Sequence, residues 1–199
     1  MPKVGVLALQ GDFLEHLEIL REIPGLDVRY VKKPEDLKGL DAIIIPGGES
    51  TAIGSLMKVK GLDRALVDFV SSGGAIMGTC AGAILLAKRV RDRVVGEINQ
   101  RTLGLMSIAV LRNAFGRQKD SFIAHVDIEG VGRVKGVFIR APAIIEAWGR
   151  AKITASIDHP AIGKVGVAAV EDRMLALAFH PEISKSISIY EYFLSIVKR

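Results

Sequence analysis

Cysteine, aromatic residues and long apolar runs are all scarce in this sequence, and each shortage excludes a class of protein. The chain has one cysteine, Cys80, so a scaffold held together by disulfide bonds is excluded. Its longest apolar stretches, such as residues 42–45 and 83–87, are far shorter than the roughly 20 residues that span a bilayer. The first residues show no signal-peptide pattern, so we expect a cytosolic protein that makes no membrane contact.

The sequence also lacks a strong excess of charge of either sign. Lysine and arginine total 27, aspartate and glutamate total 22, and the net charge is +5 without a run of five like charges. Aromatic residues make up only 6% and do not alternate with basic ones as in single-strand binders, so we expect no nucleic-acid partner. The 199 residues are 49% hydrophobic and contain no repeat or linker, which predicts one packed domain, 1–199.

Apolar runs of strand length alternate with helical patterns in the first half of the chain. Strands are predicted at residues 3–9, 28–31, 42–45 and 75–77. Helices are predicted at residues 13–22, 62–70 and 83–88. Asp12 is the expected N-cap of the first helix. Because the strands are apolar on both faces and separated by helices, they predict a parallel sheet covered on both sides.

Short β-prone runs separated by turns replace this alternation in the second half. They lie at residues 107–111, 122–128, 134–139, 152–157, 165–170 and 174–179. Such spacing indicates antiparallel hairpins added to the central sheet. A last helix is predicted at 184–197, with Ser184 as its cap and an apolar face of Ile187, Tyr190, Leu194 and Val197. The predicted fold is a single α/β domain, with a mostly parallel central sheet flanked by helices and antiparallel strand additions in the second half.

The sequence Gly78-Thr79-Cys80-Ala81-Gly82 follows an apolar strand and precedes a helix, which is the context of a nucleophile elbow. The two glycines leave room where the chain turns sharply, and the turn presents the thiol at the carboxyl edge of the sheet. A helix N-terminus at that point favours the thiolate. The alternative is a buried structural cysteine, but the elbow context favours a nucleophile.

A base for this thiol is predicted in His180-Pro181-Glu182, directly after the strand at 174–179. In an extended chain residues i and i+2 point the same way, so the imidazole and the carboxylate can meet. A carboxylate on one ring nitrogen sets the tautomer and stabilises the imidazolium that forms when the other nitrogen takes a proton. By itself the pattern also fits two solvent-exposed polar residues at a strand end. Together with the elbow it predicts a triad of Cys80, His180 and Glu182.

A third motif, Pro46-Gly47-Gly48-Glu49-Ser50-Thr51, follows the strand at 42–45. Two successive glycines let backbone N–H groups approach a ligand closely, which suits an oxyanion that develops at a carbonyl under attack. The alternative is a plain strand-to-helix turn with Ser50 or Thr51 as the N-cap. A Walker-type phosphate loop is disfavoured because no Gly-Lys-Ser/Thr follows.

These three motifs make the chain resemble the class I glutamine amidotransferases, whose fold is flavodoxin-like. More narrowly, it resembles the glutaminase subunits of pyridoxal 5′-phosphate synthase over nearly its whole length. The stretches that carry this likeness are Gly5-Val6-Leu7-Ala8-Leu9-Gln10-Gly11, residues 46–51, Arg112-Asn113-Ala114-Phe115-Gly116-Arg117-Gln118 and Gly136-Val137-Phe138-Ile139-Arg140-Ala141-Pro142. The family usually has serine where Ala114 stands, and residues 89–103 align least clearly, as a variable loop would.

The resemblance implies hydrolysis of L-glutamine to glutamate and ammonia. Cys80 would be the nucleophile, His180 the general base and then acid, and Glu182 its orienter. The backbone N–H groups of Gly48 and Ala81 would bind the oxyanion. The glutamine-binding positions would be Gly48, Glu49, Ser50, Arg112, Ile139 and Arg140. The guanidinium of Arg140 suits the substrate α-carboxylate. No cofactor is implied, and no spacing of His, Cys and Asp suggests a metal site.

The same resemblance implies a partner, the barrel-shaped synthase subunit that receives the ammonia. Ammonia released to water at neutral pH becomes ammonium, a poor nucleophile, so direct transfer within a complex has a chemical reason. We expect Gln10, on the loop after the first strand, to couple docking of this partner to formation of the oxyanion hole. The helix at 13–22 with His16 is a candidate docking face or an ordinary covering helix.

Three other functions stay open from the sequence. They are a class I amidotransferase that serves another biosynthesis, a cysteine-elbow hydrolase or chaperone, and a non-catalytic binding module of the same fold. The family-specific stretches argue against the first, and His-Pro-Glu after the last strand argues against the second. The intact set of Cys80, His180 and Glu182 argues against the third. His125 is expected to be structural, and His159-Pro160 to lie in a turn.

Overall fold

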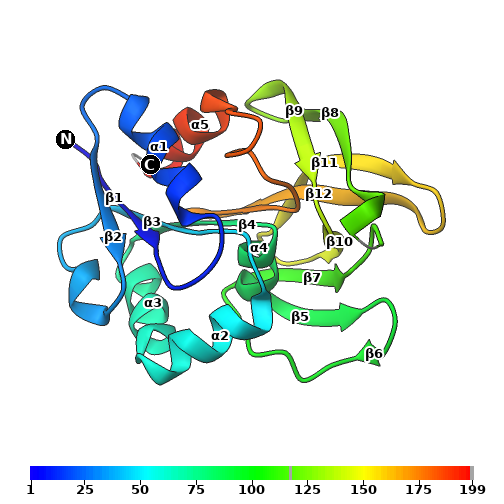
Figure 1. The fold of residues 1–199 in the computed structure, drawn as a ribbon, viewed down its shortest axis with the longest axis horizontal. Coiled ribbons are helices and arrows are strands. Elements are labelled where there is room, and N and C mark those ends of the chain that lie inside the picture. The colour runs from blue at the N-terminus through cyan, green and yellow to red at the C-terminus, as the bar shows by residue number, and fades with distance from the viewer. Residues whose placement is uncertain (117, 198–199) are drawn as a thin grey trace.

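One large sheet runs through the computed structural model, which describes residues 1–116 and 118–197 (Figure 1). Its strands, in spatial order, are β2 (Asp27–Val31), β1 (Lys3–Leu7), β3 (Ala42–Ile45), β4 (Ala75–Thr79), β13 (Met174–Leu177), β12 (Gly163–Glu171), β10 (Ala143–Ala147), β7 (Met106–Arg112), β5 (Ala87–Asp92) and β6 (Gly96–Glu97). An eleventh strand, β11 (Lys152–His159), pairs with β12.

The predicted parallel sheet with antiparallel additions is confirmed. Strands β2, β1, β3, β4 and β13 are parallel to one another. From β13 onward, β12, β10 and β7 continue the sheet with antiparallel pairing, and β11 pairs antiparallel with β12. The hairpin of β8 (Phe122–Ile128) and β9 (Gly132–Phe138) differs from the prediction, because it forms a separate two-stranded sheet. Its buried side chains, such as Val126 and Phe138, pack onto the main core instead.

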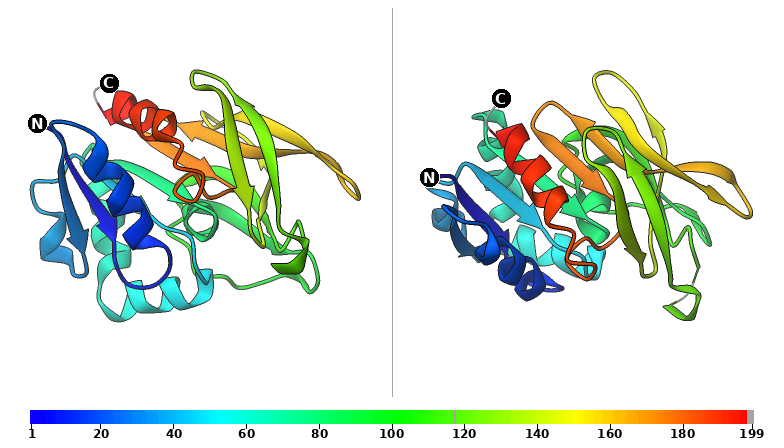
Figure 2. Two further views of the ribbon diagram at one scale, coloured as in Figure 1. Left: turned by 45° about the horizontal axis from the view of Figure 1, so that its top comes forward. Right: turned by 90° about the horizontal axis from the view of Figure 1, so that it is seen from above.

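Helices cover both faces of the sheet. They are α1 (Phe13–Glu22), α2 (Ser50–Val59), α3 (Leu62–Ser71), α4 (Ala81–Leu86) and α5 (Ile187–Val197), with 3-10 turns at Pro34–Leu37 and Gln118–Asp120. Helices α1 and α5 lie side by side on one face (Figure 2) and share a core cluster with Val6 and Ile44. Helices α2, α3 and α4 bury their apolar side chains on the other face, against Ile43 and Ile45. Within the described ranges, no helix has the length and apolarity needed to cross a membrane.

The alternation of strand side chains explains the two cores. Successive side chains of a strand point to opposite faces, so Ile43 and Ile45 enter one cluster and Ile44 enters the other. All four residues of β3 are buried. A strand that is apolar on both faces is therefore stable only at the centre of a sheet covered on both sides, which is where β3 lies.

Several element boundaries differ from the sequence prediction. Helix α4 ends at Leu86, and residues 87–92 form β5 where a helix end and a variable loop were expected. Helix α2 and strand β10 were not predicted. Helix α5 begins at Ile187, because the Ser184 hydroxyl donates to the carbonyl of Pro181 rather than capping the helix. The buried residues of α5 are Ile189, Tyr190, Phe193, Leu194 and Ile196, whereas Ile187 is largely exposed.

Candidate active site

The carboxyl ends of the parallel strands bring the predicted site residues to one edge of the sheet. Loops that follow β1, β3, β4 and β13 meet there, as ligand sites of open α/β sheets do. They border a pocket of about 440 Å³. Every residue predicted for the site except Glu182 lines this pocket: Gln10, Gly48, Glu49, Ser50, Cys80, Ala81, Arg112, Ile139, Arg140 and His180. Glu182 is buried and contacts His180.

Cys80 occupies a sharp turn between β4 and α4. Its φ of 49° and ψ of −103° are strained for a residue with a side chain. A Cβ atom on Gly78 would lie 2.5 Å from the carbonyl carbon of Gly82, and one on Gly82 would lie 2.1 Å from the carbonyl oxygen of Ile45. Glycine is therefore required on both sides of the turn. The Cys80 sulfur lies 3.9 Å from the carbonyl oxygen of Ile139 and faces the pocket.

His180 stands between the cysteine and two carboxylates. Its Nδ1 atom lies 2.5 Å from Oε1 of Glu182 and 3.3 Å from Oδ2 of Asp12. The backbone N–H of His180 donates to the carbonyl of Val137, at 2.9 Å, which holds the residue against β9. Because both carboxylates face Nδ1, the other ring nitrogen is left for the sulfur of Cys80, which lines the same pocket.

These contacts determine the charge of the His180 ring. Burial lowers its pKa, but hydrogen bonds with Asp12, Cys80 and Glu182, and the charge of Cys80, outweigh burial and raise the pKa from 6.5 to about 12. The imidazole is therefore protonated at neutral pH. The arrangement is the Cys80 sulfur facing an imidazolium, with two carboxylates behind it.

Sequence analysis missed the contact made by Asp12. The position was correctly placed as the N-cap of α1, but its side chain makes no capping hydrogen bond and instead contacts His180. The hydrogen bond to His180 is the main cause that lowers the pKa of the Asp12 carboxyl. The position of Asp12, after the carboxyl end of β1, was the sequence feature that could have predicted its contact with the site. Three further lining residues were also missed: Ile84, Asn113 and Ile183.

The two glycines after β3 form the wall opposite the elbow. Gly48 has a φ of 146°, which favours glycine, and a Cβ atom there would lie 2.6 Å from Oε1 of Gln10. That same Oε1 atom accepts the backbone N–H of Glu49 at 2.9 Å. The side chain of Gln10 thus packs directly against the peptide that was expected to bind an oxyanion. Ala81 begins α4, where backbone N–H groups have no partner within the helix.

Glu49, rather than Ser50 or Thr51, is the N-cap of α2. Its carboxylate accepts the backbone N–H groups of Thr51 and Ala52 at 3.0 and 2.6 Å. Partial burial raises the pKa of Glu49, but these two hydrogen bonds and the nearby Arg112 outweigh it, so the pKa lies below its usual value. Arg112 lies 3.8 Å from the same carboxylate.

Arginine side chains reach the pocket from two loops. Arg112, at the end of β7, donates to Gln100 at 2.5 Å and lies near Asp92. Arg140 lies in the left-handed region with a φ of 46°, immediately after Ile139. Both guanidinium groups line the pocket, and a guanidinium group suits a carboxylate. Arg117, in the same family-specific stretch as Arg112, lies outside the described residues.

The ligand atoms of Asp12, His180 and Glu182 lie within 4.8 Å of one another, close enough to hold one metal ion. No metal site was expected from the sequence. A protonated imidazole paired with two carboxylates produces the same proximity, so these distances alone do not argue for a metal.

The remaining histidines have distinct surroundings. The helix with His16 was a candidate docking face or an ordinary covering helix; the His16 side chain itself points inward and is fully buried, so it is not part of an exposed face. His159 ends β11 and holds the turn that follows, where its Nδ1 accepts the N–H groups of Ala161 and Ile162. Its other nitrogen donates to the carbonyl of Ala114 at 2.8 Å. His125 is exposed on β8.

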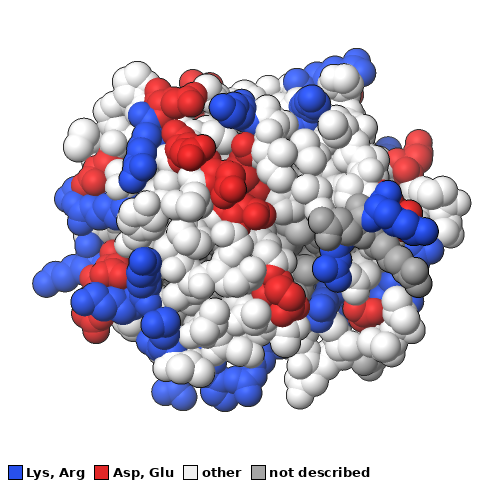
Figure 3. Space-filling model, in the orientation of Figure 1, with Lys and Arg blue, Asp and Glu red and all other residues white. Residues whose placement is uncertain are grey.

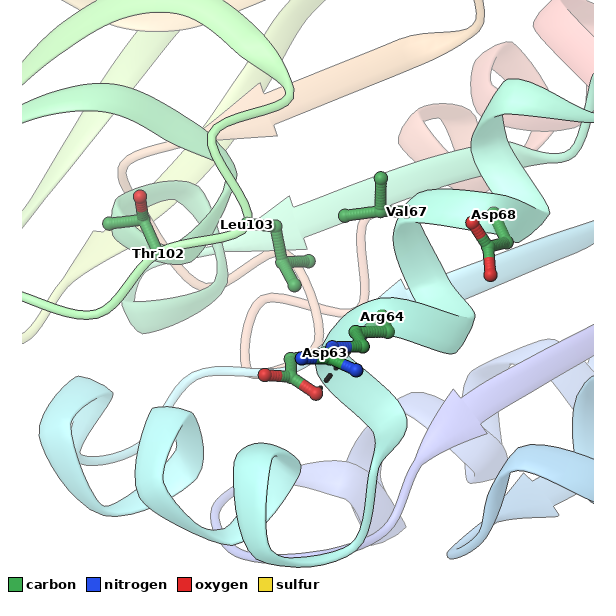
Figure 4. A pocket seen from close by; sticks show the side chains of 6 residues that line it. All are labelled: Asp63, Arg64, Val67, Asp68, Thr102 and Leu103. Atoms are coloured by element: carbon green, nitrogen blue, oxygen red, sulfur yellow. Dashed lines mark hydrogen bonds between the residues drawn. The ribbon is translucent and has the colours of Figure 1, made fainter.

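A second hollow lies between α3 and the segment at residues 102–103 (Figure 4). Its lining residues are Asp63, Arg64, Val67, Asp68, Thr102 and Leu103. Asp63 accepts the backbone N–H of Arg64, at 2.9 Å, within the first turn of α3. The lining contains no cysteine or histidine, so the pocket around Cys80 is the better candidate for nucleophilic chemistry.

Comparisons with known proteins agree with this geometry. A family model for the SNO glutamine amidotransferase family matches residues 6–199. A protein of Hyperthermus butylicus, pyridoxal 5′-phosphate synthase subunit PdxT, is 53% identical over 198 residues, which cover 100% of this chain and 98% of that protein. The PdxT subunit of Saccharolobus solfataricus is 48% identical and covers 98% of this chain and 99% of its own length.

Solved structures share the fold. A crystal structure of a glutamine amidotransferase superposes with a TM-score of 0.87 at 42% identity, covering 98% of this chain and 99% of that one. The structure of PurLQS from Thermotoga maritima has a TM-score of 0.66 at 16% identity, covers 98% of each chain and shows the fold alone.

Fold and site together define a class of α/β protein, the glutamine amidotransferases, in which a cysteine stands on a strand-to-helix elbow beside a histidine and an acid. Within that class, the chain belongs to the SNO glutamine amidotransferase family.

Proposed function

We propose that this chain is the glutaminase subunit of a pyridoxal 5′-phosphate synthase and that it hydrolyses L-glutamine through Cys80, His180 and Glu182. The observation that carries the proposal is the elbow thiol facing an imidazole whose Nδ1 lies 2.5 Å from a buried carboxylate. The PdxT relatives, at about half identity over the full length, support the assignment of the pathway.

The first half of the reaction makes a thioester. The Cys80 sulfur attacks the side-chain amide carbon of glutamine, and the carbonyl oxygen becomes an oxyanion. The N–H groups of Gly48 and Ala81 bind this oxyanion. When the tetrahedral intermediate collapses, its C–N bond breaks and the imidazolium of His180 donates a proton to the leaving nitrogen. Ammonia departs, and a γ-glutamyl thioester remains on Cys80.

The second half releases glutamate. His180 is now neutral and removes a proton from a water molecule that attacks the thioester carbon. The C–S bond breaks, Cys80 regains its thiolate, and His180 is again an imidazolium. Glu182 keeps the Nδ1 side of the ring occupied throughout, so the other nitrogen always faces the reacting atoms.

Substrate binding uses the rest of the pocket. The α-carboxylate of glutamine binds at Arg140, because a guanidinium group can form two parallel hydrogen bonds to a carboxylate. Glu49 and Arg112 line the same pocket, together with the buried Ser50 and the carbonyl of Ile139. Both oxygens of Glu49 already cap α2, so its direct contact with substrate uses the lone pairs that remain.

The synthase subunit docks beside the pocket and receives the ammonia. The outward face of α1 is the candidate contact, and its exposed residues are Leu14, Glu15, Glu18, Arg21 and Glu22, with three acids against one base. Acidic side chains gather over α1 in Figure 3, although the chain as a whole is basic. This face replaces the one expected around His16. An acidic surface with one exposed leucine suits a basic, partly apolar patch on the partner.

Docking is coupled to the oxyanion hole through Gln10. This side chain joins the loop before α1 to the Gly48–Glu49 peptide, since its Oε1 accepts the Glu49 N–H. A shift of the loop on docking would therefore be transmitted through the Gly48–Glu49 peptide to Gly48, whose own N–H is the proposed oxyanion donor.

The test is a glutaminase assay with and without the synthase subunit of the same organism. We expect ammonia release by the wild-type chain to rise strongly with the partner, and we expect Cys80→Ala to abolish it. Turnover by Cys80→Ala comparable to wild type would eliminate the thiolate mechanism. Stimulation by the synthase subunit of another amidotransferase, but not by this one, would assign the chain to a different biosynthesis.

A further inference from the structure

His16 is the buried ionisable group that the proposed reaction leaves unused. It lies on α1 and is fully buried, directly behind the candidate triad. Its Nδ1 atom lies 2.8 Å from the hydroxyl oxygen of Tyr190 on α5. Its Nε2 atom lies 3.1 Å from Oγ1 of Thr79 and 3.4 Å from Oε2 of Glu182. Thr79 is the residue before Cys80.

These surroundings keep the His16 ring neutral. Burial lowers its pKa, with His180 acting in the same direction, and the charges of Glu182, Asp12 and Glu15 oppose this only in part. The pKa of Tyr190 is raised well above its usual value by burial and by the charge of Glu182, so its hydroxyl keeps its proton.

One tautomer of His16 satisfies every neighbour. The Tyr190 hydroxyl donates to Nδ1, and the ring N–H is then on Nε2, where it donates to Thr79 Oγ1 and presents its positive end to Glu182 Oε2 at 3.4 Å. The other tautomer would place a nitrogen lone pair opposite a buried carboxylate oxygen. Within the described residues that oxygen has no hydrogen-bond partner, and His16 Nε2 is the ring nitrogen that faces it at 3.4 Å. An unpaired buried carboxylate oxygen is costly, so the first tautomer is strongly favoured.

We propose that His16 is a positioning residue for the triad, attracting Oε2 of Glu182 electrostatically to its Nε2–H at 3.4 Å so that Oε1 stays aimed at Nδ1 of His180. Tyr190 sets the tautomer of His16, and the contact with Thr79 ties the same ring to the strand that ends at the nucleophile. The inference rests on the proposed function and deepens it, because it explains why the carboxylate keeps its orientation.

The experiment uses the full chain with its synthase partner and measures two quantities. The first is kcat and KM for glutamine. The second is the rate at which iodoacetamide alkylates Cys80, the single cysteine of the chain, as a function of pH. The variants are His16→Leu, His16→Gln and Tyr190→Phe. The matched control is Tyr192→Phe, which removes a hydroxyl from the same helix where it faces Gly130 instead of the site.

Loss of the His16 contact weakens the stabilisation of the His180 imidazolium. For His16→Leu we expect the pH at which alkylation of Cys80 begins to rise to move up by about one pH unit. At a given low pH this corresponds to about a tenfold smaller fraction of thiolate. We expect kcat to fall by about tenfold while KM changes less than about twofold. His16→Gln places an amide N–H near the position of Nε2 and restores most of kcat. Tyr190→Phe gives an intermediate effect, and Tyr192→Phe gives none.

A folded His16→Leu variant with the kcat and alkylation profile of Tyr192→Phe would overturn the inference. If His16→Leu does not fold, Tyr190→Phe provides the test, because it removes only a hydroxyl. A Tyr190→Phe variant with the kcat and alkylation profile of Tyr192→Phe would then overturn the inference. Failure of the proposed function would look different: the wild-type chain would release no ammonia with its partner. The alkylation profile would still report whether His16 acts on Glu182 and His180.

Discussion

Oδ2 of Asp12 lies 3.3 Å from Nδ1 of His180, so the residue that precedes α1 contacts the imidazole and does not cap its own helix. Two carboxylates, Asp12 and Glu182, therefore share one ring nitrogen. Glu182 is buried and Asp12 is partly exposed at the pocket rim. The buried acid orients the ring, and the rim acid adds negative charge that favours the imidazolium.

Asp12→Asn should lower kcat by about three- to tenfold with little change in KM, because charge is lost beside the imidazolium and the substrate contacts remain. Asn caps a helix about as well as Asp, so capping is tested with Asp12→Ala, whose cost should stay below the roughly 1 kcal/mol that loss of a capping side chain costs, since no capping bond exists. Steady-state kinetics and urea denaturation measure both. Glu191→Gln, an exposed carboxylate on α5, is the control. A destabilised variant with normal kcat would mean that Asp12 is a helix cap after all.

The raised pKa of His180 makes folding stability depend on pH. Burial lowers that pKa, but the bonds with Asp12, Cys80 and Glu182 raise it to about 12, against 6.5 in the unfolded chain. The stabilising contribution is therefore complete below pH 6.5 and is lost as the pH rises toward the folded value. The stability advantage of wild type over His180→Gln should shrink with pH by at most about 1.4 kcal/mol per unit. Urea denaturation at pH 6, 8 and 10 measures it, and a constant difference would contradict it.

Gly82→Ala should destabilise the protein by about 1–3 kcal/mol or more and reduce glutamine hydrolysis. A Cβ atom at position 82 would lie 2.1 Å from the Ile45 carbonyl oxygen, so α4 and the elbow would have to move away from β3. Gly54→Ala is the matched control, because it lies inside α2 and its nearest neighbour would be 3.3 Å away. We expect this control to stay within about 1 kcal/mol of wild type. Equal stability of both variants would refute the requirement for glycine at position 82.

Gln10→Ala removes the acceptor for the Glu49 N–H and should reduce partner-stimulated turnover by about tenfold. Affinity for the synthase subunit should change little, because the docking face is on α1. Sedimentation measures the affinity, and ammonia release measures the turnover. If stimulated turnover by Gln10→Ala equalled that of wild type, Gln10 would not couple docking to the oxyanion hole.

Local sequence patterns predicted most of the elements, and the ones they missed share a physical cause. The apolar faces of α1 and β8 repeat with the period of their own secondary structure, so both were predicted with the observed bounds, Phe13–Glu22 and Phe122–Ile128. Strand β5 carries exposed Lys88, Arg89 and Arg91 and lacks an apolar run. Only β6 pairs beyond it, so β5 lies near the edge of the sheet, where a strand does not need to be apolar on both faces. Its strand structure comes from pairing with β7, which no local pattern encodes.

The sequence by itself determined the chemistry of the site. It placed a cysteine between two glycines at a strand end, a histidine two residues before an acid at another, and paired glycines at a third. Only the tertiary structure decided which further groups act on them. His16 and Tyr190 are 174 residues apart and meet behind Glu182, and Asp12 turns from its helix to His180. Periodicity reports on neighbours along the chain, whereas these contacts depend on the order of strands across the sheet and on helices α1 and α5 lying side by side.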